Sequence, residues 1–202
     1  MLKVRLRDCD VRDAVHRKVL ADHHCEPETL VLDELGLQNG ACRVDIAVIN
    51  GFIHGFEIKS DSDTLDRLPR QIDLYGEVLD RATIVVGERH SDTILHFLPS
   101  WWGIKVAERG RRGAVHLHDV RRPCRNSGII PEAVAALLWS SEAIDILEKY
   151  GAARGVRGKR RELQYQRLAE VLPIDILCEE VRLRLKERSG WRGNSVSASR
   201  QT

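Results

Sequence analysis

The chain has 202 residues, of which 31% are charged, 43% are hydrophobic and only 5% are aromatic, with a formal net charge of +2 at pH 7. This composition is typical of a soluble globular protein with one sizeable core. No run of 18 or more apolar residues is present, and the charged start MLKVRLRDCDVRDAV lacks a signal-peptide core, so we expect neither a membrane span nor a secretory leader. Five scattered cysteines, an odd number, predict a reducing cytoplasm rather than a disulfide framework.

Charge is distributed unevenly along the chain. Residues 1–104 carry a net charge of −6, and residues 105–202 carry +8. One interpretation is an acidic half that holds a metal ion and a basic half that holds phosphate. The other is a solvated surface with a chance asymmetry.

The spacing of apolar residues predicts an α/β protein in which one helix, three strands, a second helix and a fourth strand follow one another. The run Asp61-Ser-Asp-Thr offers N-cap candidates for the second helix, which would follow directly, and Pro69 argues against that helix because proline is tolerated only near a helix start. The predicted elements are a helix over 9–22, a strand over 30–35, a hairpin with strands over 43–49 and 52–59, a helix to about residue 80 and a buried strand over 83–86.

The second half of the chain is predicted to be mainly helical. A short helix over 91–98 and a hairpin over 104–107 and 114–120 come first, and residues 121–130 form a linker. Helices are then predicted over 131–150, 159–172 and 174–188, and the Ser/Gly-rich tail is expected to be disordered. The predicted organisation is a core over 1–120, a helical region over 121–190 and a disordered tail over 191–202.

The stretch CRVDIAVINGFIHGFEIKSD, residues 42–61, has the pattern of a hairpin in which apolar residues alternate. A three-residue loop of Ile49, Asn50 and Gly51, with Gly51 in a left-handed conformation, would pair Val48 with Phe52. An equivalent bulge near Gly55 would have the same effect. Either one places the apolar even positions on one buried face, namely Val44, Ile46, Val48, Phe52, Phe56 and Ile58.

This register gathers three charged residues on the opposite face. Asp45 is predicted to oppose Gly55, with Glu57 diagonal to it and Lys59 two residues further on. Two carboxylates at one point suit Mg²⁺, and a nearby ammonium can stabilise an attacking water or phosphoryl charge. The alternative is an exposed strand face with an ordinary ion pair, worth at most about 1 kcal/mol.

The pattern Asp45…Glu57-Ile58-Lys59, placed across a hairpin, resembles the PD-(D/E)XK nuclease superfamily. The resemblance implies a restriction-endonuclease-like α-β-β-β-α-β core, here with a helical C-terminal extension. It also implies that Mg²⁺ or Mn²⁺ is bound by Asp45, by Glu57 and by the carbonyl of Ile58, with Lys59 as the catalytic lysine.

Two further stretches strengthen the resemblance. Gln71 and Tyr75 are similar to the Q-x-x-x-Y motif of the RecB-like exonuclease branch, and one helical turn separates them, so both can face one cleft. The run from ELGL through DIAVINGFIHGFEIKSDSDTLDRLPRQ to VVGERH and WWGI is similar to a bacterial and phage family within the superfamily, over about residues 8–190. One departure is that Arg43-Val44 stands where the superfamily has a proline before the aspartate.

Other residues leave two interpretations open. Glu34 is either a third acid near the metal or a surface residue at a strand end. The His23-His24-Cys25 run lacks a second cluster with ligand spacing, which argues against zinc. Trp101 and Trp102 could stack an unpaired base, although such a pair more often closes the edge of a core.

A basic link, GAARGVRGKRR, separates two of the predicted helices. It is either a contact for the nucleic-acid backbone or a solvated linker, and the nuclease-like core favours the contact. The predicted binding residues are Arg154, Arg157, Lys159, Arg160 and Arg161.

The function expected from these features is metal-dependent hydrolysis of DNA phosphodiesters in a cytoplasmic phage or bacterial protein of repair or defence. RNA as substrate and a homodimer are left open. The alternatives are a non-catalytic nucleic-acid-binding or assembly module on the same fold, and a small-molecule or tRNA-processing enzyme.

Overall fold

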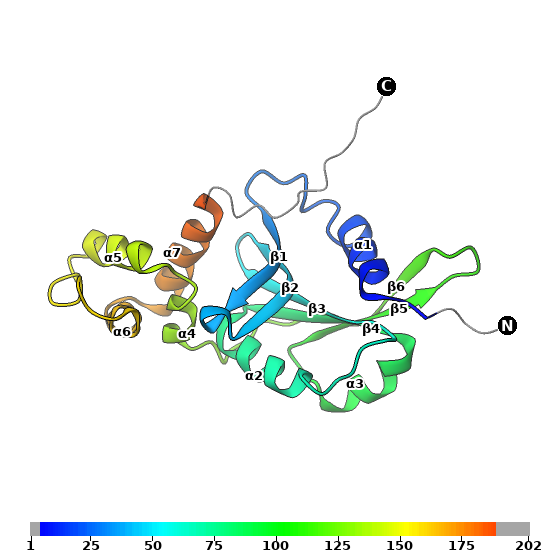
Figure 1. The fold of residues 1–202 in the computed structure, drawn as a ribbon. Helices are drawn as coiled ribbons and strands as arrows, with labels where there is room; N and C mark the ends of the chain where they lie inside the picture. The colour runs from blue at the N-terminus through cyan, green and yellow to red at the C-terminus, as the bar shows by residue number, and fades with distance from the viewer. Residues whose placement is uncertain (1–4, 189–202) are drawn as a thin grey trace, which may run out of the picture.

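A computed structural model of the chain describes residues 5–188 and is a mixed α/β structure around one six-stranded sheet (Figure 1). The strands lie in chain order, from β1 at one edge to β6 at the other. Neighbouring strands are antiparallel from β1 to β3, parallel from β3 to β5, and antiparallel again between β5 and β6. The strands are β1 (Leu30–Leu37), β2 (Cys42–Ile49), β3 (Ile53–Lys59), β4 (Arg81–Gly87), β5 (Gly103–Arg109) and β6 (Val115–Arg121).

Seven α-helices surround the sheet in the described part of the chain. Figure 1 shows α1 on one face and α2 and α3 on the other, with α4 to α7 gathered beside the β1–β2 end. No helix within residues 5–188 has the length and apolar character needed to cross a bilayer. The helices are α1 (Asp8–Lys18), α2 (Leu68–Val78), α3 (Ser91–Phe97), α4 (Pro131–Ala135), α5 (Ser140–Lys149), α6 (Arg161–Val171) and α7 (Ile174–Glu187).

Each face of the sheet has its own buried cluster. On the face that α1 covers, Val11 and Val15 pack against Ile46, Phe56 and other strand residues. The opposite face is covered by α2, and its larger cluster continues without a break into the four C-terminal helices. The C-terminal helices therefore extend the core of the α2 face, and burial of their apolar sides stabilises both parts.

The β2–β3 hairpin has the predicted parity but a different register. Ile49 pairs with Ile53, so the three-residue loop is Asn50-Gly51-Phe52, one position later than predicted, and Val48 faces His54 rather than Phe52. Gly51 does not have the predicted left-handed conformation. The Asn50 side chain, which accepts a hydrogen bond from the Phe52 N–H at 3.2 Å, closes the turn instead.

The predicted single apolar face is interrupted beside Asp45. Ile46 and Val48 pack on the α1 face as expected, but Val44 belongs to the cluster of the α2 face. The pairs formed by β1 and β2 omit Glu34 and Asp45, and Glu34 has a left-handed backbone with φ of +61°. Since a left-handed non-glycine residue costs free energy, this irregularity marks a position where the backbone is held away from regular strand geometry.

The predicted helix over 131–150 is two helices. Trp139 is extended, and its N–H donates a hydrogen bond to the Glu142 carboxylate at 2.7 Å, so a new helix begins at Ser140. Arg188, distant in sequence, donates to the Leu137 carbonyl at 2.7 Å and thereby satisfies a group that the break leaves free.

Two other predictions differ in extent. The helix expected directly after residues 61–64 begins only at Leu68, because Ser60 and Asp63 form a hydrogen-bonded turn first. The predicted disordered tail over 191–202 lies outside the described residues. The remaining strands and helices lie within a few residues of their predicted positions, so the mixed α/β class with C-terminal helices is confirmed.

Candidate functional site

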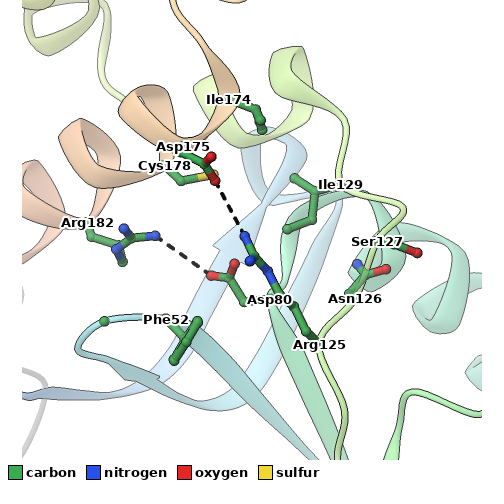
Figure 2. A pocket seen from close by; sticks show the side chains of 11 residues that line it. Phe52, Asp80, Arg125, Asn126, Ser127, Ile129, Ile174, Asp175, Cys178 and Arg182 are labelled. Carbon is green, nitrogen blue, oxygen red and sulfur yellow. Dashed lines mark hydrogen bonds and ion pairs between the residues drawn. The ribbon is translucent and has the colours of Figure 1, made fainter.

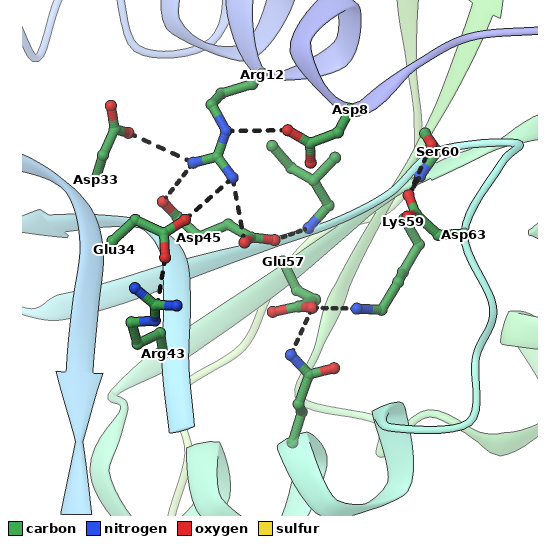
Figure 3. A network of polar contacts seen from close by, with 12 residues as sticks. Asp8, Arg12, Asp33, Glu34, Arg43, Asp45, Glu57, Lys59, Ser60 and Asp63 are labelled. Atoms are coloured by element: carbon green, nitrogen blue, oxygen red, sulfur yellow. Dashed lines mark hydrogen bonds and ion pairs between the residues drawn. The ribbon is translucent and has the colours of Figure 1, made fainter. Parts of the chain in front are cut away.

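Glu57 on β3 is a buried carboxylate surrounded by polar side chains. It is 1% exposed, and Lys59 Nζ lies 2.5 Å from its Oε1. Gln71 Nε2 donates to the same oxygen at 2.6 Å, and the Tyr75 hydroxyl lies 2.5 Å from Oε2. Lys59, Gln71 and Tyr75, which the sequence predicted to act together with Glu57, therefore all contact its carboxylate. Figure 3 shows the contact between Lys59 and Glu57.

Helix α2 positions Gln71 and Tyr75, the two residues that bind the Glu57 carboxylate from this helix. Its first turn contains Pro69, and its buried side packs on the sheet, which brings Gln71 and Tyr75 to the same face one turn apart. The ring of Trp102 stacks on Tyr75 with centroids 5.6 Å apart and planes nearly parallel. Trp102 is fully buried, so its predicted place at the core is confirmed, and it supports the tyrosine rather than an unpaired base.

Asp45 on β2 is held by groups from two other elements. Its Oδ2 accepts a hydrogen bond from the Ile58 N–H at 2.7 Å, which places it beside β3 near Glu57. Its other oxygen lies 3.2 Å from Arg12 on α1, and Arg12 also donates to the Asp45 carbonyl at 2.8 Å. The backbone carbonyl and the carboxylate of Asp45 are thus both held in place. The carboxylate oxygens still have lone pairs that can accept a further ligand.

Burial and neighbouring charges affect these groups in opposite ways. Burial first, and the Glu57 carboxylate second, raise the pKa of Asp45 to about 7. Burial lowers the pKa of Arg12, but the carboxylates of Asp45 and Asp8 outweigh it and the pKa rises. Burial and Glu57 also raise the pKa of Tyr75, so its hydroxyl stays protonated and can donate.

Glu34, the candidate third acid, shares Arg12 with Asp45. Its Oε1 is 3.5 Å from Arg12, and its Oε2 is 3.3 Å from Arg43. The Glu34 side chain is 44% exposed. Its left-handed backbone, beside Asp45, sets it apart from an ordinary strand-end residue, because such outliers concentrate at functional sites.

A pocket of about 670 Å³ opens above these residues. We call it the carboxylate pocket. Its wall is formed by β2, β3, the loop after β3 and the start of α2, and it is more polar than apolar. Its charged lining consists of Asp8, Glu34, Arg43, Asp45, Glu57, Lys59, Asp63, Asp66, Arg67 and Arg70.

The donors in the carboxylate pocket fit a hydrated Mg²⁺ or Mn²⁺ ion. Within residues 5–188 no group of three or more His, Cys, Asp or Glu side chains is arranged around a common metal position. Mg²⁺, however, commonly takes one or two carboxylates and retains several waters. Asp45 and Glu57 supply the two, and the buried amide oxygen of Gln71, which has no hydrogen-bond partner among the described residues, can accept from a bound water. Coordination by the Ile58 carbonyl stays a prediction.

Comparisons with known proteins place the chain in a family. The model of the family described as bacteriophage P4 protein cII matches residues 6–199. The chain belongs to this family.

Two similar proteins match part of this chain. Protein cII of Enterobacteria phage P4 is 27% identical over 124 residues, which are 61% of this chain and 47% of that protein. The chain spans about half the length of this curated relative. A solved protein of unknown function from Silicibacter pomeroyi is 21% identical and covers 77% of this chain and 97% of its own length, with a TM-score of 0.45.

The basic link is not part of the carboxylate pocket. It forms the turn between α5 and α6, at the outer end of the helical region in Figure 1, and none of its five basic residues lines the pocket. All five are exposed. Arg157 pairs with Glu148 at 2.8 Å and Arg161 with Glu162 at 3.5 Å, so part of the charge of the link is already neutralised.

Four arginines around the carboxylate pocket were missed by reasoning from the sequence. Arg12 could have been found from the helical spacing that puts it on the same side of α1 as Asp8, facing the acidic strands. Arg67 and Arg70 stand three residues apart just before Gln71, so their place beside the Q-x-x-x-Y motif could have indicated that they line the same pocket. Arg43 takes part through its backbone as well, because its carbonyl lies 2.8 Å from the Tyr75 hydroxyl.

A second pocket, of about 460 Å³, lies between the β2–β3 loop, the 125–129 segment and α7 (Figure 2). We call it the α7 pocket. Its charged side chains are paired: Arg125 lies 3.4 Å from Asp175, and Arg182 lies 4.0 Å from Asp80. Its lining also includes the apolar or weakly polar side chains of Phe52, Ile129, Ile174 and Cys178.

Proposed function

We propose that this protein hydrolyses DNA phosphodiesters at the carboxylate pocket with the help of Mg²⁺ or Mn²⁺. The observation that carries the proposal is the convergence of Lys59, Gln71 and Tyr75 on the buried carboxylate of Glu57 in an open pocket that Asp45 also lines. Burial of a carboxylate costs free energy, and clusters of buried titratable side chains concentrate at functional sites.

The order of elements supports a restriction-endonuclease-like core. The helix α1, the antiparallel strands β1 to β3, the helix α2 and the parallel strand β4 follow one another as that fold requires. The acidic residues lie on its second and third strands, and the glutamine and tyrosine lie on its second helix. Since a fold by itself does not imply a function, the side chains carry the proposal.

The residues have separate roles in the proposed reaction. Asp45 and Glu57 hold the metal, and the chemistry supplied by a bound ion is polarisation of a phosphoryl oxygen and a lower pKa for the attacking water. Gln71 and Tyr75 hold the Glu57 carboxylate in one orientation through their hydrogen bonds. The Lys59 ammonium, next to the same carboxylate, stabilises the negative charge that develops on the phosphoryl oxygens.

The test compares cleavage of supercoiled, linear and single-stranded DNA in Mg²⁺ and in Mn²⁺ by the wild type and Lys59→Met. Lys105→Met is the matched control, because Lys105 is a strand lysine 2.5 Å from a carboxylate, that of Asp119, outside the carboxylate pocket. We expect metal-dependent cleavage that Lys59→Met reduces by about 100-fold or more and the control leaves intact. Wild-type protein that binds either metal but cuts no DNA would contradict the proposal, and RNA would then be tested.

A non-catalytic nucleic-acid-binding module is the second candidate function, and one observation favours it. Arg12 already pairs with Asp45 at 3.2 Å and with Glu34 at 3.5 Å, so a cation of the protein itself partly neutralises the acids. Isothermal titration with Mn²⁺ separates the two functions, because the nuclease needs metal at Asp45 and Glu57, whereas a binding module does not.

A further inference from the structure

Arg67 and Arg70 are two exposed arginines at the mouth of the carboxylate pocket. Arg67 immediately precedes α2 and Arg70 lies in its first turn, and both line the pocket together with Asp45 and Glu57. Neither guanidinium forms a hydrogen bond or an ion pair with another residue in the part of the chain that the structure describes. Two positive charges are therefore available to an external anion at this position.

The surroundings of the two arginines do not explain their presence. The first turn of α2 contains no acidic residue, and cations at the positive end of a helix slightly destabilise it. The nearby carboxylates are engaged elsewhere, since Asp63 accepts from the Ser60 N–H at 2.7 Å and Asp66 accepts from the Thr64 hydroxyl at 2.8 Å. Local stability thus favours neither Arg67 nor Arg70, whereas an anion bound at the pocket would favour both.

We propose that Arg67 and Arg70 bind phosphates of the DNA strand on its way into the carboxylate pocket. This inference rests on the nuclease function proposed above and names the surface that binds its substrate. Guanidinium groups suit the task, because they bind phosphate through two parallel hydrogen bonds and stay charged at any physiological pH. Six carboxylates line the same pocket and repel a phosphate backbone, so cations at its mouth are needed to bring the strand to Asp45 and Glu57.

The proposal gives the basic link a secondary place. Arg154 and Arg160 are also exposed and lack ion-pair partners among the described residues, but they lie in the turn between α5 and α6 and do not line the pocket. Charge alone cannot separate the two surfaces, since each offers a pair of unpaired arginines. Position can separate them, because only a phosphate bound near the pocket lies next to the scissile bond.

The experiment measures the binding of short fluorescein-labelled oligonucleotides, single-stranded and duplex, by fluorescence anisotropy in EDTA at several salt concentrations. EDTA prevents cleavage, so binding is measured apart from the proposed reaction. The test variant is Arg67→Gln/Arg70→Gln, and the rival surface is tested by Arg154→Gln/Arg160→Gln. The control with the same change of charge is Arg17→Gln/Arg167→Gln, in which an exposed and a partly exposed helix residue each lose the pair with a carboxylate of their own helix.

We expect Arg67→Gln/Arg70→Gln to weaken binding by about tenfold or more and to reduce the slope of log K against log salt by about 1.4 on single strands, for two lost phosphate contacts. Thermal denaturation should show that the variant folds as the wild type does. An equal or larger loss in Arg154→Gln/Arg160→Gln, or wild type that binds neither oligonucleotide, would overturn the inference.

The same measurements distinguish failure of this inference from failure of the nuclease proposal. DNA binding that depends on Arg67 and Arg70, without cleavage in Mg²⁺ or Mn²⁺, supports phosphate binding by the two arginines and contradicts the nuclease function. Cleavage by the wild type, together with unchanged DNA binding by Arg67→Gln/Arg70→Gln, supports the nuclease function and overturns phosphate binding by the two arginines.

Discussion

Glu57 and Asp80 are both buried carboxylates beside a pocket, but different kinds of group hold them. Asp80, in the α7 pocket, is 4% exposed and accepts a hydrogen bond from the Ile53 N–H at 2.8 Å, while its own N–H donates to the Ile53 carbonyl at 3.0 Å. Among residues 5–188, the Glu57 carboxylate in the carboxylate pocket is bound only by the side chains of Lys59, Gln71 and Tyr75.

The difference separates a structural carboxylate from the one that we propose to be functional. Asp80 fixes one strand end to another through backbone groups, and a nearby arginine balances its charge. Around Glu57 the acids outnumber the bases, and the repulsion is visible in the pKa of Asp45, which the Glu57 charge helps to raise to about 7. A protein under selection for stability alone would avoid the second arrangement, which is why it indicates a function.

The largest effect expected is on activity, from Glu57→Gln. The change preserves size but removes the charge that would hold a metal, so we expect DNA cleavage to fall at least about 1,000-fold, which is about 4 kcal/mol. The free energy of unfolding without metal should fall by about 1–2 kcal/mol, because the loss of the ion pair with Lys59 is partly offset by the hydrogen bonds of the amide and by the end of the repulsion with Asp45. Cleavage assays and urea denaturation measure the two quantities. Wild-type cleavage by this variant would remove Glu57 from the proposed site.

The next effect is on stability, from Asp80→Ala. Loss of this carboxylate removes the acceptor of the Ile53 N–H and the ion-pair partner of Arg182. The free energy of unfolding should therefore fall by about 3 kcal/mol. Urea denaturation measures the loss. Asp175→Ala in the same pocket is the control, and we expect a change below about 0.5 kcal/mol because the pair of Asp175 with Arg125 is exposed. Equal losses for the two variants would show that Asp80 has no special structural role.

Tyr75→Phe should give a smaller effect on both properties. The hydroxyl lies 2.5 Å from Glu57 and 2.8 Å from the Arg43 carbonyl, and because it carries a single proton its loss removes one donor that these two acceptors share. We expect about 1 kcal/mol less stability and about tenfold slower cleavage. Trp102→Phe, which keeps an aromatic ring against Tyr75, shows whether slower cleavage comes from packing alone. Unchanged cleavage in Tyr75→Phe would show that Gln71 and Lys59 suffice to orient Glu57.

The last effect is a dependence of stability on pH that belongs to neither pocket and is absent at neutral pH. Burial lowers the pKa of His54 on β3 to about 3, with smaller contributions from the nearby charges of Arg81, His23 and Lys105. Between pH 6.5 and about 3 the unfolded chain binds a proton that the folded protein does not, so stability decreases as the pH falls, by at most about 1.4 kcal/mol per pH unit.

The variant His54→Gln tests this dependence. It should flatten the dependence of stability on pH in that range, as measured by urea denaturation at several pH values. It also isolates the contribution of His54 from that of the pocket carboxylates. A dependence on pH as steep as in the wild type would assign the effect to another group.

The local pattern of residues 42–61 predicted much of the candidate site. Alternation in the hairpin predicted that even positions oppose even positions, and the structure confirms this parity. The register nevertheless differs by two residues, because the turn is closed by the side chain of Asn50 rather than by a left-handed Gly51. Either turn satisfies the same alternation, so the pattern of apolar residues could not choose between them.

The break at Trp139 and the place of the basic link could not be predicted from local patterns. A continuous helix over 131–150 satisfies helix propensity, and Arg188, about 50 residues further on, binds the carbonyl that the break releases. The link has the composition of a phosphate-binding segment, but where it lies relative to Asp45 depends on how the four C-terminal helices pack.

The sequence by itself determined the order of strands and helices, the hairpin parity and the residue types of the carboxylate pocket, because these depend on periodicity and on side-chain chemistry. Only the tertiary structure decided that Arg12 binds Asp45, that Tyr75 reaches Glu57 and that Arg67 and Arg70 stand at the mouth of the pocket. Such contacts join segments up to 33 residues apart, as between Arg12 and Asp45. They follow from the packing of α1 and α2 on opposite faces of one sheet, which no local pattern encodes.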